Sequence, residues 1–145
     1  MNSTSNQTAY LIKAGAYPGT TIASGTAANT ISAALYTGPS TAGLFTDILF
    51  RNASSAAVNL NIILVPSGGS SATEANSRAQ IQIPANAGNN GSVALASLAA
   101  LAPALFDLDL AGNRVVLMES GDTVYVQNVG ALTGDLNITV KARNF

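Results

Sequence analysis

Short runs in which every second residue is apolar are the most constraining feature of this sequence. From Val58 to Leu64, apolar residues occupy alternate positions with Asn59 and Asn61 between them, and the same period recurs in residues 79–83 and 136–140. Successive side chains of a β-strand point to opposite faces, so this period predicts strands with one face in a core and the other in water.

Turn-forming residues separate these runs. GPS, SGGSS and ANAGNNGS lie between apolar stretches, and about eight or nine short strands follow one another without a strand-helix-strand rhythm. Strands in this arrangement favour an all-β fold, an antiparallel β-sandwich or jelly roll. We expect residues 13–145 to form one such domain and the polar residues 1–12 to form a flexible N-terminal arm.

One segment departs from the strand pattern. In residues 93–102, Ala and Leu recur at spacings of three and four before Pro103, which favours a short helix or helical turn. Two strands with a bend between them is the alternative interpretation.

The composition limits the chemistry open to this chain. It contains no Cys and no His, so it lacks a thiol nucleophile, an imidazole base and the preferred ligands of zinc, copper and iron. We expect no enzymatic activity, no cofactor and no bound metal.

Charged residues are few. They make up 9% of the chain, with a net charge of −1, whereas a typical soluble domain has about a quarter. Such a surface favours association with other copies or another protein. The six cations are scattered, so we expect no nucleic-acid partner. The longest apolar stretch, residues 93–106, is short and interrupted by Pro103, so we expect no membrane span.

Four carboxylates are the candidates for chemistry. Asp107 and Asp109 are two residues apart in FDLDL, a spacing that suits glycoside hydrolysis or calcium binding. The structural interpretation is favoured: an alternating strand with Phe106, Leu108 and Leu110 inward and both aspartates in water.

The stretch LMESGDTVYVQN carries the other two carboxylates, Glu119 and Asp122. Gly121 can adopt a positive φ and Asp122 can accept a backbone hydrogen bond, so we interpret it as a corner between two strands. Val124 is then expected on one face of the second strand and Tyr125 on the other, as core or as an interface anchor.

The glycine-rich segment SGGSS, residues 67–71, lacks the Lys of a phosphate loop and is interpreted as a flexible connection. The eight aromatic residues are spread along the chain, which favours packing over a sugar-stacking platform. Tyr10, beside Leu11 and Ile12, is the aromatic residue best placed to contact another subunit.

Two segments resemble small bacteriophage virion proteins. In residues 34–66, a Tyr-Thr-x-Pro step precedes a strand, and an Asn-centred turn and a second apolar strand follow. The segment MESGDTVYVQN is similar to a strand-to-strand corner of those proteins and of tumour-necrosis-factor-like jelly rolls.

The resemblance implies a capsid decoration, or cement, protein. Such a protein is expected on the capsid surface of the virion, as a homotrimer bound to the major capsid protein, after synthesis in the bacterial cytoplasm. Contacts with the shell or a neighbouring subunit are then expected at Tyr10, Leu11, Ile12 and Tyr17.

Two other classes of function stay open at this point. A carbohydrate- or receptor-binding β-sandwich of a phage tail or other surface structure predicts an aromatic or carboxylate cluster on one face. An enzyme using two of the four carboxylates predicts a deep pocket around them with at least one raised pKa.

Overall fold

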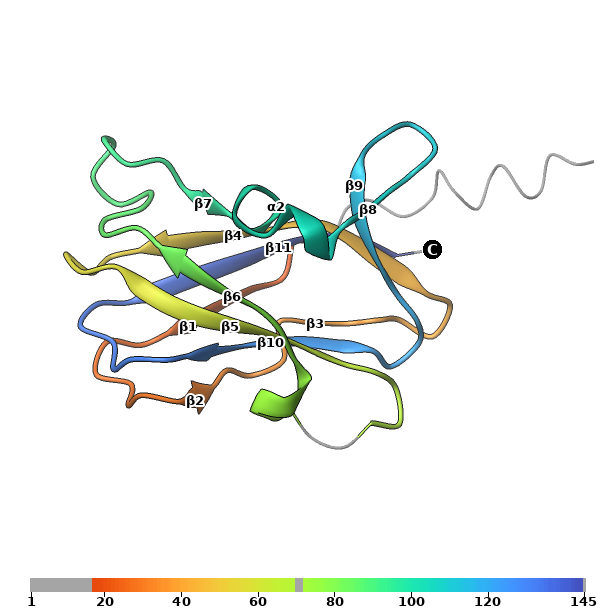
Figure 1. The fold of residues 1–145 in the computed structure, drawn as a ribbon, viewed down its shortest axis with the longest axis horizontal. Coiled ribbons are helices and arrows are strands. Elements are labelled where there is room, and N and C mark those ends of the chain that lie inside the picture. Colours follow the sequence, from red (N-terminus) through yellow and green to blue (C-terminus); the bar gives the residue numbers. More distant parts are fainter. Residues whose placement is uncertain (1–16, 70–71, 145) are drawn as a thin grey trace, which may run out of the picture.

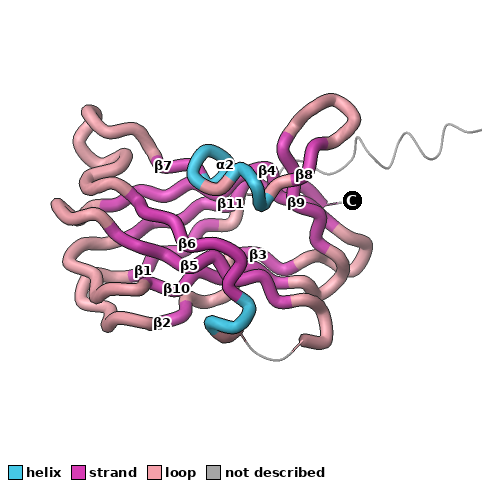
Figure 2. The backbone as a smooth tube through the Cα atoms, viewed as in Figure 1, coloured by secondary structure: helices cyan, strands magenta, loops and turns pink. Residues whose placement is uncertain are grey.

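Two antiparallel β-sheets face each other in this protein (Figures 1 and 2). The computed structural model describes residues 17–69 and 72–144. Within them, the first sheet contains, in spatial order, β1 (Gly19–Ile22), β11 (Leu136–Asn144), β4 (Gly43–Asn52), β9 (Arg114–Met118) and β8 (Asp107–Leu108), and β7 (Ala96–Ser97) also pairs with β4. The second sheet contains β2 (Thr30–Ile31), β10 (Thr123–Asn128), β5 (Val58–Val65) and β6 (Ser77–Ile83), and β3 (Tyr36–Thr37) also pairs with β10.

The strand order is that of a jelly roll. Because β2 and β3 both pair with β10, they act as one interrupted strand. Without the two-residue strands β7 and β8, the described residues then contain eight principal strands. The first sheet holds the first, eighth, third and sixth of these, and the second sheet holds the second, seventh, fourth and fifth. The expected all-β sandwich is therefore confirmed.

The predicted alternation places the core between the two sheets. From the second sheet, Leu60, Ile62 and Val124 are fully buried, and Phe50 and Ile138 meet them from the first. Residues 136–140 bury every second side chain, as expected. One detail differs: Asn61, expected to face water, is buried.

The segment before Pro103 forms a strand and then a helical turn. Ala96 and Ser97 pair with β4, and α2 (Leu98–Leu101) follows, with Ser97 as its N-cap. The β4 carboxylate of Asp47 accepts hydrogen bonds from the Ser97 hydroxyl (2.7 Å) and the Ala99 N–H (3.0 Å). The short helix is thus confirmed, but it is confined to one turn, because Ala96 and Ser97 before it are paired with β4 and Pro103 begins the next turn.

Short 3-10 turns complete the described elements: η1 (Glu74–Asn76) precedes β6, and η2 (Pro103–Leu105) precedes β8. The Asn-centred turn after β4 is built on Asn52, which is fully buried. Its side-chain amide donates to the carbonyls of Ala56 and Pro84, and its oxygen accepts from the Ser54 N–H. One side chain therefore fixes the β4–β5 connection against the end of β6.

Phe50 tests whether the core between the sheets is the main source of stability. Phe50→Ala should lower the free energy of unfolding by about 3–5 kcal/mol, because it leaves a cavity among fully buried side chains. Leu49→Ala is the control on the same strand, since Leu49 is only half-buried. Chemical denaturation measures both, and equal losses would contradict this account of the core.

Candidate functional site

The first pair of candidate carboxylates lies in a hairpin that projects from the sandwich. Asp107 begins β8, which pairs with β9, and Asp109 lies in the turn between them (Figure 1). Asp109 accepts hydrogen bonds from the backbone N–H groups of Ala111 (2.9 Å) and Asn113 (2.8 Å) and from the Asn113 side chain (3.0 Å). Its carboxylate closes the turn.

These hydrogen bonds change the acidity of Asp109. Its pKa is lowered, first by the hydrogen bond from the Asn113 side chain and then by the backbone hydrogen bond from the same residue, because both stabilise the charged form. The Asn113 side chain offers its NH₂ group, a donor, to the carboxylate. Asp109 and Asn113 therefore pair with each other and do not jointly present oxygens to a calcium ion.

The prediction that Leu108 and Leu110 of the FDLDL segment point into the core is wrong. Leu108 is 69% exposed and Leu110 is fully exposed, whereas Phe106 is partly buried and packs edge-to-face on Phe45 with ring centroids 6.0 Å apart. The hairpin leaves the body of the sandwich after Phe106, so no second sheet lies beneath the two leucines. Both aspartates are exposed, as expected.

In the second pair of carboxylates, Glu119 and Asp122, only the Asp122 side chain accepts hydrogen bonds within the described residues. Asp122 accepts hydrogen bonds from the N–H of Glu119 and the N–H of Ser67, each at 2.8 Å. Gly121 has φ of +87°, in the region that favours glycine. The interpretation as a strand-to-strand corner is supported, and Asp122 also ties this corner to the loop after β5. Val124 is buried in the core, whereas Tyr125 lies half-buried on the opposite face of β10.

Among residues 17–69 and 72–144, no group of three or more acidic side chains could hold a metal ion. In the same part of the chain, no helix is long and apolar enough to cross a bilayer. Residues 70 and 71 of the glycine-rich segment lie outside the described residues. Ser67 N–H is held by Asp122, so the segment begins in a fixed connection.

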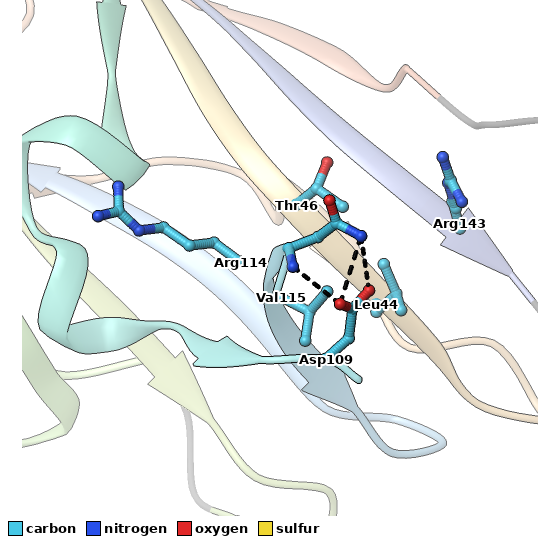
Figure 3. A pocket seen from close by; sticks show the side chains of 7 residues that line it. Leu44, Thr46, Asp109, Arg114, Val115 and Arg143 are labelled. Atoms are coloured by element: carbon cyan, nitrogen blue, oxygen red, sulfur yellow. Dashed lines mark hydrogen bonds between the residues drawn. The ribbon is translucent and has the colours of Figure 1, made fainter. Parts of the chain in front are cut away.

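A cavity of about 620 Å³ lies between the hairpin and the outer face of the first sheet (Figure 3). Leu44 and Val115 provide apolar surface, Asp109 lies on the hairpin side, and Arg143 lies across from it on β11. Arg114 extends away from Asp109 and donates to the carbonyl of Ala99 at 2.6 Å. The cavity contains one candidate carboxylate, already engaged in its turn, so it lacks the carboxylate pair that the hydrolase interpretation needs.

The aromatic residues do not gather into one platform. Tyr36 and Phe50 are in the core, and the Tyr36 hydroxyl donates to Asn144 at 2.5 Å. Burial raises the pKa of Tyr36 because the charged form is poorly solvated there. Tyr17, a predicted contact residue, is 68% exposed and lies two residues before the start of β1. Tyr10, Leu11 and Ile12 lie outside the described residues.

Sequence reasoning missed an amide ladder on the outer face of the second sheet. Asn61 donates to Gln127 (2.9 Å), and Gln80 donates to Asn61 (3.1 Å), which links β10, β5 and β6. Two residues further along the same strand pair, the Gln82 side chain donates a hydrogen bond to the Asn59 side chain at 3.1 Å. The alternating Asn and Gln were visible in sequence, but strand register was needed to show that they pair. The ladder satisfies its amides internally, so it leaves fewer of them for a ligand.

Sequence reasoning also missed a set of exposed leucines away from the outer face of the second sheet. Leu101, Leu108 and Leu117 are each exposed by more than two fifths, and Leu110 is fully exposed. They belong to α2, the β8–β9 hairpin and the far end of β9. In Figure 1, α2 and the hairpin lie along the upper edge of the sandwich, and β9 runs down from the hairpin. We call Leu101, Leu108, Leu110 and Leu117 the leucine edge. Several large apolar side chains exposed on neighbouring elements are candidates for an interaction site.

Comparison with known proteins gave no significant match to any family model, curated protein or solved structure.

Asp122 offers a test of the corner. Asp122→Ala should lower the free energy of unfolding by about 1–3 kcal/mol, because two backbone N–H groups lose their acceptor. Asp122→Asn keeps one side-chain oxygen and should lose less. Glu119→Ala is the matched control, because within the described residues its side chain makes no hydrogen bond. Thermal and urea unfolding measure all three, and an equal loss in Glu119→Ala would disprove this role of Asp122.

The pKa of Asp109 provides a second test. Its pKa in the folded protein should lie below that of an ordinary aspartate, and Asn113→Ala should raise it by removing the largest cause. Because the folded pKa is lowered, the contribution of Asp109 to hairpin stability is fully present above the ordinary pKa of about 3.9 and is lost as the pH falls through the lowered value. Carboxyl-carbon NMR titration follows it directly. A pKa unaffected by Asn113→Ala would refute the assignment.

Proposed function

We propose that this chain is a non-enzymatic structural protein of a bacteriophage virion. In this proposal it is a capsid decoration protein that binds the assembled shell as a homotrimer and stabilises it. The observation that carries the proposal is the leucine edge: a sandwich with 9% charged residues exposes Leu101 on α2 and Leu108 and Leu110 on the β8–β9 hairpin, which Arg114 holds against α2. A protein whose role is to cover other subunits needs such a surface.

The position of Tyr17 supports the proposed contact region. The strand that follows it, β1, pairs antiparallel with β11, and the Pro18 carbonyl accepts from the Val140 N–H at 2.9 Å. Tyr17 therefore lies toward the end of β11 that carries Arg143. The β8–β9 hairpin lies at the same end of the molecule (Figure 1). Contacts made by Tyr17 and by the hairpin would thus fall at the same end of the protein.

The roles of the carboxylates also support binding without catalysis. Asp47, Asp109 and Asp122 each accept hydrogen bonds that hold a turn or a helix start. A shell-binding protein requires no reactive group. It stabilises the capsid by burying surface that spans subunits only after assembly, and three linked copies bind more tightly than one.

Deletion of residues 1–12 tests the proposed shell contact. The truncated protein should stay folded and form an oligomer with the same number of copies as the full chain. It should bind shells at least about tenfold more weakly, because it loses Tyr10, Leu11 and Ile12. Co-sedimentation with shells made from the major capsid protein of the same genome measures binding. Unassembled capsid subunits are the control and should bind poorly. Unchanged shell binding by the truncated chain would remove the arm from the proposal, and no binding by the full chain would overturn it.

A carbohydrate- or receptor-binding sandwich is the second candidate. The cavity of about 620 Å³ favours it, since Thr46, Asn113 and Arg143 offer polar groups beside apolar surface. If the protein bound a specific glycan and did not bind capsid shells, the order of the two proposals would be reversed.

A further inference from the structure

The β8–β9 hairpin presents two leucines on a rigid projection. Leu108 is 69% exposed and Leu110 is fully exposed, and the turn between the strands is closed by Asp109 and Asn113. At its base, Arg114 donates to the Ala99 carbonyl, which holds the hairpin against α2. The projection is plain in Figures 1 and 2. A rigid projection loses little conformational entropy when it binds, so its leucines are suited to act as an anchor.

A second cavity lies where the two sheets separate. It has a volume of about 230 Å³, and its apolar lining includes Leu64, Pro66, Val116 and Met118, from β5, the residue after it and β9. Removal of one large core side chain leaves a space on the order of 150 Å³. This inter-sheet cavity therefore has room for one leucine side chain and part of a second.

The charges around the two features are complementary. Asp107 begins the hairpin strand beside Leu108, and Arg78 lines the inter-sheet cavity. Within residues 17–69 and 72–144, neither side chain has a hydrogen bond or an ion pair. The carboxylate that lines the cavity, Asp122, is already held by two backbone N–H groups. A hairpin that entered the cavity would bring its free carboxylate to a free guanidinium.

The hairpin cannot reach the cavity of its own chain. Both belong to β9: Arg114 lies at the hairpin end of the strand, whereas Val116 and Met118 line the cavity. An extended strand of five residues spans about 16 Å and is held straight by its pairing with β4. The occupant must therefore come from another molecule, and a second copy supplies both the leucines and the matching charge.

We infer that the leucine tip of the β8–β9 hairpin of one copy inserts into the inter-sheet cavity of a second copy, with Asp107 facing Arg78. The inference rests on the homotrimer of the proposed function and names its contact. Tip and cavity are different surfaces, so the contact is head-to-tail, and head-to-tail contacts close into rings when the rotation between copies permits.

Replacement of the two leucines tests the apolar part of the contact. Leu108→Ser with Leu110→Ser should weaken self-association of the full chain by at least about 100-fold, because burial of each leucine accounts for a factor of about 10 to 100. Leu95→Ser is the matched control: Leu95 is also exposed but lies before β7, outside the contact, and should leave association unchanged. Sedimentation equilibrium measures association, and circular dichroism verifies that each variant is folded.

Charge reversal tests the pairing of Asp107 with Arg78. Asp107→Arg and Arg78→Glu should each weaken association by about tenfold, and the double variant should recover most of the loss. Recovery excludes misfolding as the cause, since two independent folding defects would add.

The outcomes separate this inference from the proposed function. If the wild-type protein associates but the leucine and charge variants associate equally well, the contact is overturned while the homotrimer stands. If the double reversal fails to recover, the pairing of Asp107 with Arg78 is overturned. A wild-type protein that stays monomeric would overturn both the contact and the trimer, and shell binding is measured separately.

Discussion

Burial of two apolar sheet faces against each other is the constraint on which this structure depends. Phe50 and Ile138 from the first sheet meet Leu60 and Val124 from the second, and all four are excluded from water. The chain contains no cysteine, so no disulfide contributes to its stability. The hydrophobic effect across this single interface therefore supplies most of the stabilisation.

Polar side chains then decide how the strands are connected. Asp47, Asn52 and Asp122 each satisfy backbone or side-chain donors that the connections would otherwise leave unpaired. Backbone groups removed from water require partners, and a short polar side chain provides one without a longer loop. The same use accounts for two of the four carboxylates that could suggest catalysis in the sequence, Asp109 and Asp122, which are engaged in turns.

The surface divides into two different regions. On the outer face of the second sheet, Asn61 and Gln127 belong to a ladder of amides that satisfy one another. Along the opposite edge, Leu108 and Leu110 are exposed on a hairpin that its own turn holds rigid. The first region is satisfied within the molecule, and the second gains stability only by contact with another surface. Interaction is therefore expected at the leucine edge.

Local features of the sequence were predictable to the extent that neighbouring residues decide them. The Gly121 turn and the capping carboxylate of Asp122 could be inferred, because the Glu119 N–H that Asp122 binds is three residues away. Its other partner, Ser67, is 55 residues away, and no local pattern indicates it. The pairing of Asn61 with Gln127 likewise required strand register.

By itself, the sequence determined the strands, their inward faces and the sandwich, because a period of two leaves each strand one apolar side that must be buried. Tertiary structure alone decided which apolar residues stay outside. The FDLDL pattern reads as a strand with buried leucines, but burial requires a second surface, and the hairpin extends beyond the opposite sheet. Leu108 and Leu110 thus follow the alternation of a core strand and still face solvent.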